Sequence, residues 1–161
     1  MVEQDAPAAL EAFEAMLKEG YEVKEEAVPA LLDQLIAGAK PEVADALRVS
    51  MLLRVLALFR QNKDRAAMDR LYRLLEDAQE KVGDERKLVQ FLKNHLEIKK
   101  VMGETAGQVD LIDQIGNRLF KLGETAAARE YYEMGLKLRA ELQQPGQPAS
   151  EAKSGTTTQT A

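Results

Sequence analysis

The sequence predicts an all-α protein, and three observations lead to this fold class. Apolar residues recur at three- and four-residue spacing along most of the chain, which is the spacing of one helix face. Glycine or asparagine follows most of these segments, as it does at helix ends. No segment alternates apolar and polar residues as a half-buried strand does. We therefore expect about seven antiparallel helices.

The first two predicted helices are short. Asp5 can cap a helix that runs through Leu10, Phe13 and Leu17, and Gly20 would end it. A second helix is expected over residues 29–37, because proline is favoured at the first helical position and glycine follows the last one.

Five further helices are expected from Pro41 onward. The first of them runs to about Gln61, is apolar nearly all round over residues 49–59, and gives way to a turn at Asn62. The others span about 64–82, 85–102, 107–122 and 125–142, with Gly83 stopping the first of these four. Residues 1–142 thus form one helical domain, and residues 143–161 lack the apolar side chains that a folded segment buries, which predicts a disordered tail.

The last two predicted helices meet at a tight turn. Gly123 supplies the left-handed conformation that ends a helix, and Thr125 can cap the next helix. Gly116 and Ala128 are small residues on apolar faces, which lets the two helices approach closely. Gly116 costs roughly 1 kcal/mol of helix propensity relative to alanine, so we expect a packing reason for it.

The string GNRLFKLGETAAAREYYEMGLKL resembles the tetratricopeptide repeat, a helix–turn–helix unit of about 34 residues. The match is one clear repeat at about 109–142. Aligning Leu58-Phe59 with Leu119-Phe120 places a degenerate second repeat at about 48–81, with Ala67 on Ala128 and Asn62 on Gly123. The resemblance implies a right-handed superhelix of stacked helices.

Composition excludes several classes of protein. The chain has no cysteine, so it has no disulfide framework and no thiol chemistry. No stretch approaches the roughly 20 apolar residues of a membrane span, and no apolar run follows a basic start, so we expect no membrane insertion and a cytoplasmic location. Residues 42–100 carry thirteen bases and ten acids, and this interleaving argues against a nucleic-acid surface.

Residues suited to chemistry are sparse. His95 is the single histidine and lacks nearby partners, so a structural role at the edge of a helix face is expected. The carboxylate pairs Asp110/Asp113 and Glu130/Glu133 have no Glu-x-x-His companion of the kind that di-metal bundles use. No phosphate loop, nucleotide fingerprint or nucleophile motif occurs. We expect no enzyme activity, no metal and no cofactor.

A binding surface remains, and the resemblance locates it. In tetratricopeptide proteins the first helix of each repeat lines a concave groove. Ten positions match that face here: Val49, Leu52, Leu56, Phe59 and Arg60 in the degenerate repeat, and Asp110, Asp113, Asn117, Phe120 and Lys121 in the clear one. The first set is nearly all apolar, which suits an amphipathic helix lying in a groove. Alternatively, the first two helices of the chain cover it. Asp113 stands where co-chaperones of this family carry a carboxylate-binding lysine, so the resemblance does not imply that clamp.

The sequence thus predicts a non-enzymatic protein–protein interaction module, such as an adaptor, assembly factor or chaperone, that holds a peptide or helix of a partner protein. The alternative is a self-associating structural scaffold module whose repeat ends stack between copies. Charged residues on the last helix, including Arg129, Glu133 and Lys137, can cap that end and favour a monomer with a partner.

Overall fold

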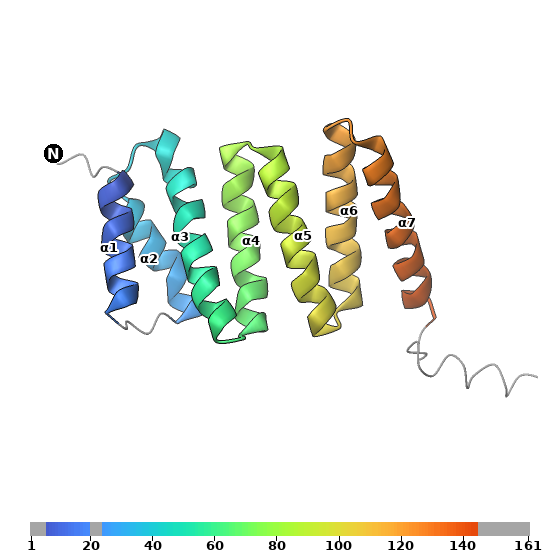
Figure 1. Cartoon of the computed structure of the whole chain (residues 1–161), viewed down its shortest axis with the longest axis horizontal. Helices are drawn as coiled ribbons and strands as arrows, with labels where there is room; N and C mark the ends of the chain where they lie inside the picture. The colour runs from blue at the N-terminus through green and yellow to red at the C-terminus, as the bar shows by residue number, and fades with distance from the viewer. Residues whose placement is uncertain (1–5, 20–23, 145–161) are drawn as a thin grey trace, which may run out of the picture. The chain divides into compact units, whose positions relative to one another are not determined.

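A computed structural model describes residues 6–19 and 24–144, with only the backbone for residues 6–10. These residues form helices joined by turns and contain no strand, which confirms the all-α prediction for this part of the chain (Figure 1). Asp5, Gly20 and residues 145–161 of the expected tail lie outside the described residues. The elements are α1 (Ala6–Lys18), the 3-10 turn η1 (Glu25–Ala27), α2 (Val28–Ile36), α3 (Pro41–Gln61), α4 (Arg65–Val82), α5 (Glu85–Met102), α6 (Thr105–Lys121) and α7 (Thr125–Leu142).

The chain divides into two compact units within α5. One unit ends at Phe91 and the other begins at Leu92. Each is described by itself below, and the single domain expected over residues 1–142 stays a prediction.

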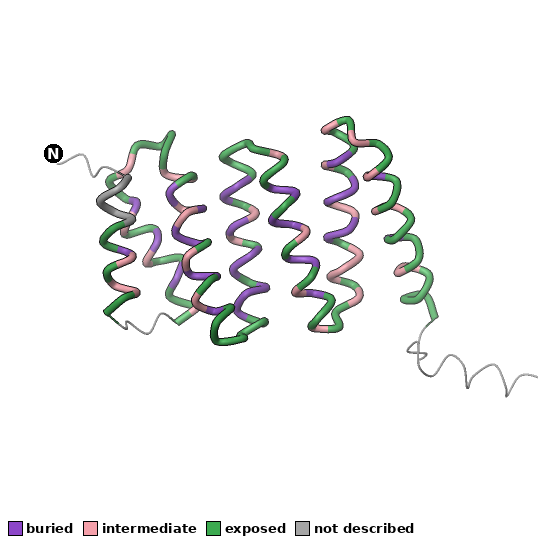
Figure 2. Tube along the Cα trace, in the orientation of Figure 1, coloured by how far each residue is buried: buried purple, intermediate pink, exposed green. Residues whose placement is uncertain are grey.

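The first unit is built on the hairpin of α3 and α4, with α1 and α2 packed against α3. Buried residues recur along α3 and α4 of this unit (Figure 2). Phe13 of α1, Val28 of α2 and Met51 of α3 are fully buried in its core. Ion pairs hold the outer helices in place: Arg54 binds Glu14 of α1, and Arg48 lies 2.9 Å from Asp33 of α2. The N-terminal helices therefore cover one side of α3.

The second unit is built on the antiparallel hairpin of α6 and α7. The small residue Gly116 does have a packing reason, but the group against it is the ring of Tyr132. A Cβ atom at position 116 would lie 2.7 Å from Cε1 of that ring. Ala128, the expected counterpart, is buried in the same unit, yet the three atoms nearest to such a Cβ all belong to Tyr132. An aromatic ring, which needs more room than a methyl group, thus fills the space opposite the glycine.

From α3 onward, the turns follow one another at a constant interval of 20 residues along the chain. A residue with positive φ ends the turn region at Lys63, Gly83, Gly103 and Gly123. The turn expected at Asn62 is present, and within it Asn62 is right-handed (φ −81°) while Lys63 takes the left-handed conformation (φ 55°). The acidic residue that follows serves as N-cap: Asp64 accepts a hydrogen bond from the Ala67 amide (3.1 Å). Glu124, not the expected Thr125, is the N-cap of α7, and its side chain makes no capping hydrogen bond.

Burial repeats with the same interval as the turns. The buried residues Met51, Leu52 and Val55 of α3 recur one interval later as Leu71, Tyr72 and Leu75 of α4, which are also buried. The same positions of α5 and α6 are Phe91, Leu92, His95, Leu111, Ile112 and Ile115, all buried. From α3 to α6, the buried positions therefore recur once for each helix and its turn, every 20 residues. Two such intervals make 40 residues, whereas the tetratricopeptide repeat has about 34 residues.

This interval explains which polar residues are buried. His95 stands at the position of Val55 and Leu75, and it is buried in the core rather than at the edge of a helix face. Gln79 and Lys99 stand at the position of Phe59. The Lys99 ammonium reaches Glu104, while its aliphatic stem packs against Gly107. A long amphipathic side chain can thus fill a core position while its charge is paired.

Candidate functional site

The apolar half of the predicted binding face is buried. Val49, Leu52, Leu56 and Phe59 all lie in the core, with Leu56 only 2% exposed, and Arg60 alone is exposed. Since α1, α2 and α4 all pack against α3, the chain's own helices bury these four side chains. A partner reaching these four side chains would have to displace them from the core.

A one-residue error in the repeat alignment explains why the predicted binding residues of α3 are buried. The turns pair Lys63 with Gly123, whereas the alignment in the sequence analysis paired Asn62 with Gly123. One residue turns a helix by about 100°, which moves a surface position into the core. In the corrected register, the counterparts of the α6 face are all outside the buried core: Ser50, Leu53, Ala57, Arg60 and Gln61. In the sequence, aligning the apolar pair Met51-Leu52 with the apolar pair Leu111-Ile112 gives the corrected register.

The corrected face borders a hollow on the first unit. This hollow has a volume of about 350 Å³ and is bounded by α1 and the C-terminal half of α3. Ala57 and Gln61 of the corrected face line it, together with residues of α1 that the sequence analysis did not single out: Glu14, Leu17 and Lys18. The pair of Arg54 with Glu14 spans the hollow and fixes its charges.

The second half of the predicted face lies open on α6. At about 100° per residue, its five members fall within one third of the helix circumference. None of them is buried: Asp110, Asp113, Asn117, Phe120 and Lys121. We refer to these five residues as the α6 strip.

Neighbouring side chains hold three of the four polar members of the α6 strip in place. Asp113 accepts a hydrogen bond from the Arg139 guanidinium of α7. Asn117 Oδ1 accepts one from the hydroxyl of Tyr132 (2.9 Å). Asp110 accepts one from the Gln114 amide (2.9 Å). Fixed side chains lose less conformational entropy when a ligand binds them than mobile ones do.

Phe120 is the apolar member of the α6 strip and is 60% exposed. Its counterpart in the first unit, Arg60, is exposed as well and donates a long hydrogen bond to Tyr72 (3.4 Å). A large aromatic side chain in water among fixed polar groups is typical of the residues that anchor a protein partner.

One tyrosine of the second unit has an altered acidity. Burial raises the pKa of the half-buried Tyr131 phenol, and the nearby Glu97 and Glu130 carboxylates act in the same direction, while Lys100 opposes them. The Lys93 ammonium lies 5.8 Å from the centre of the Tyr131 ring, within the range of a cation–π contact. These groups link Tyr131 of α7 with residues of the last part of α5, and the raised pKa leaves the phenol neutral near pH 7.

Within residues 6–19 and 24–144, no three histidine, cysteine or acidic side chains converge as a metal site would require. In the same part of the chain, no helix combines the length and the apolar character needed to cross a membrane.

Comparison of the sequence with protein-family models gives no match, and no curated protein is significantly similar to it. The resemblance to the tetratricopeptide repeat therefore rests on the residues of the chain alone.

Proposed function

We propose that the chain is a non-enzymatic helical-repeat module, similar to tetratricopeptide proteins, that binds a peptide or an amphipathic helix of a partner protein along the α6 strip. Phe120 is the anchor in this proposal, and its 60% exposure is the observation that carries it. Aromatic side chains contribute a disproportionate share of binding energy where a partner desolvates them.

The other members of the α6 strip determine the direction in which a partner segment binds. Asp110 and Lys121 place a negative and a positive charge about three helical turns apart along α6. Asn117 keeps an amide that faces solvent while its oxygen is held by Tyr132. A partner segment with an apolar side chain for Phe120 and charges opposite to these two would fit the strip in one direction only.

The constant interval between the turns supports the helical-repeat part of the proposal. A short fixed period is typical of proteins in which successive units stack and present extended binding surfaces. By the same interval, Leu53, Ala57 and Arg60 are the corresponding surface of the first unit.

Site-specific photocrosslinking tests the proposal. A photoreactive phenylalanine at position 120 should crosslink one defined partner protein in the native cell, and the same probe at Val101, which is also 60% exposed, should not. With the purified partner, Phe120→Ala should weaken binding by roughly 30-fold, the effect of a hot-spot truncation. Val101→Ala is the matched control. Equal binding by wild type and Phe120→Ala would refute the role of the strip.

A further inference from the structure

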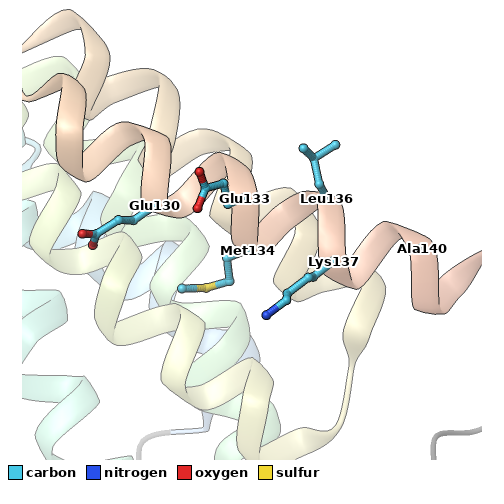
Figure 3. A pocket seen from close by; sticks show the side chains of 6 residues that line it. All are labelled: Glu130, Glu133, Met134, Leu136, Lys137 and Ala140. Atoms are coloured by element: carbon cyan, nitrogen blue, oxygen red, sulfur yellow. The ribbon is translucent and has the colours of Figure 1, made fainter.

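The last described helix, α7, exposes a leucine whose counterparts in α3 and α5 are buried. In the register set by the turns, Leu136 stands at the position of Leu56 and Leu96, and both of these are only 2% exposed. Leu136 itself is 64% exposed. It borders an open hollow of about 640 Å³ along α7, which is also lined by Met134, Lys137 and Ala140 (Figure 3).

The charges on this face of α7 are arranged symmetrically. Glu133 and Lys137 each lie two positions from Gly135, which is buried against α6. At about 100° per residue, both therefore project within about 20° of the direction opposite to Gly135, straight into solvent. Leu136 points to one side of this charged pair and Met134 to the other (Figure 3). The face thus has Glu133 and Lys137 at equal distances from its centre, with an apolar side chain on each flank, and Glu130 lines the N-terminal end of the same hollow.

We infer that this face binds the same face of a second copy of the chain, with the two α7 helices antiparallel and the two-fold axis beside Gly135. A two-fold interface brings each surface patch against itself. The antiparallel arrangement places Glu133 of each copy opposite Lys137 of the other, so that both ion pairs form at once. On one flank Leu136 contacts its own equivalent, and on the other flank Met134 does the same, which removes both apolar groups from water.

Self-complementarity favours a second copy over other occupants. A different protein would have to reproduce the same order of charges and apolar groups, whereas a second copy supplies it by symmetry. The contact involves one helix face, which places it at the low end of interface sizes. We therefore expect a reversible dimer with a Kd of roughly micromolar or weaker. This inference does not depend on the α6 strip.

Charge reversal tests the dimer in the full-length chain, with sedimentation equilibrium as the measurement. Glu133→Lys places two lysines opposite each other at both contacts, and Lys137→Glu does the same with two glutamates. Each variant alone should be monomeric at concentrations where wild type dimerises. An equimolar mixture of the two variants should form a heterodimer, because every contact then joins a lysine to a glutamate. The double variant Glu133→Lys/Lys137→Glu should dimerise with itself.

Two controls separate this outcome from general effects of charge and of folding. Asp77→Lys changes the net charge as much as Glu133→Lys but alters an exposed residue of α4, and it should dimerise like wild type. All variants should retain the helical circular dichroism of wild type. A wild type that is monomeric at millimolar concentration would overturn the inference. Single variants that dimerise as well as wild type, or a mixture that stays monomeric, would overturn it too.

Discussion

The ring of Tyr132 occupies the space that a side chain on Gly116 would need. A Cβ atom at position 116 would lie 2.7 Å from Cε1 and 3.0 Å from Cδ1 of this ring. The Tyr132 hydroxyl donates a hydrogen bond to Asn117, one residue further along α6. The glycine thus admits the ring, and the ring in turn fixes a residue of the α6 strip. This one contact therefore links the packing of the α6–α7 hairpin to the conformation of Asn117 in the proposed binding surface.

The first prediction follows from this contact. Gly116→Ala should gain about 1 kcal/mol of helix propensity, yet we expect a net loss of about 1–3 kcal/mol in the free energy of unfolding, because the ring has to move. In a Tyr132→Ala background the space is open, and the same change should stabilise the protein. Urea unfolding of the four proteins measures this coupling. An equal effect of Gly116→Ala in both backgrounds would show that the ring does not restrict position 116.

The sequence was sufficient for the helices and for most of their ends. The predicted bounds of the helices at 41–61, 85–102 and 125–142 agree with α3, α5 and α7, since proline, glycine and the apolar periodicity act locally. The turn expected at Asn62 lies there, and the left-handed residue within it is Lys63. Asparagine tolerates that conformation better than lysine does, so local preference alone does not single out Lys63, whereas the constant spacing of the turns does.

The candidate site was harder to predict because it depends on helix rotation. Aligning the single feature Leu58-Phe59 with Leu119-Phe120 displaced the register by one residue, and that error rotates the whole set of predicted contacts. Phe59 is buried and Phe120 is exposed, so these two phenylalanines are not equivalent. Covering of α3 by α1 and α2 is a long-range effect that the pattern of α3 alone does not contain.

The second prediction tests the register on adjacent residues of α3. Leu56→Ser should destabilise the protein by about 3 kcal/mol or more, since it removes a buried leucine and leaves a hydroxyl in the core. Ala57→Ser, one residue later, lies at an exposed position and should change the free energy of unfolding by less than about 0.5 kcal/mol. Thermal unfolding followed by circular dichroism compares the two. A stable Leu56→Ser variant would mean that the apolar residues of α3, namely Val49, Leu52, Leu56 and Phe59, are accessible. They would then belong to the candidate site again.

The third prediction concerns the left-handed residues of the turns. Lys63 adopts φ 55° and bears a Cβ atom, which costs roughly 1–2 kcal/mol in this conformation. Lys63→Gly should therefore raise the thermal midpoint, although the more flexible unfolded chain offsets part of the gain. Gly83→Ala at φ 90° should lower the midpoint, even though nothing lies within 4 Å of the added methyl group. If both substitutions shifted the midpoint in the same direction, backbone conformation would not be the controlling factor at these turns.

The fourth prediction uses the raised pKa of Tyr131, whose main cause is burial. In the folded protein the neutral phenol is favoured, so its pKa lies above the value of about 10 that applies to the unfolded chain. Below pH 10 both states hold the proton and the contribution to stability is complete. As the pH rises above 10, the unfolded chain loses its proton first, so the free energy of unfolding falls until the pH passes the folded pKa. Urea midpoints between pH 9 and about 11 should therefore fall more steeply for wild type than for Tyr131→Phe, which cannot ionise.

Lys100 provides the matched test of the cause, because its charge opposes the shift in the pKa of Tyr131. Lys100→Gln should move the phenol absorbance transition of Tyr131, obtained as the difference between proteins with and without Tyr131→Phe, to still higher pH. The Glu97 carboxylate, which lies 3.0 Å from the Lys100 ammonium, then acts on the phenol without a compensating charge. A transition for Tyr131 at pH 10 or lower would show that the phenol is solvated and that burial does not control its pKa.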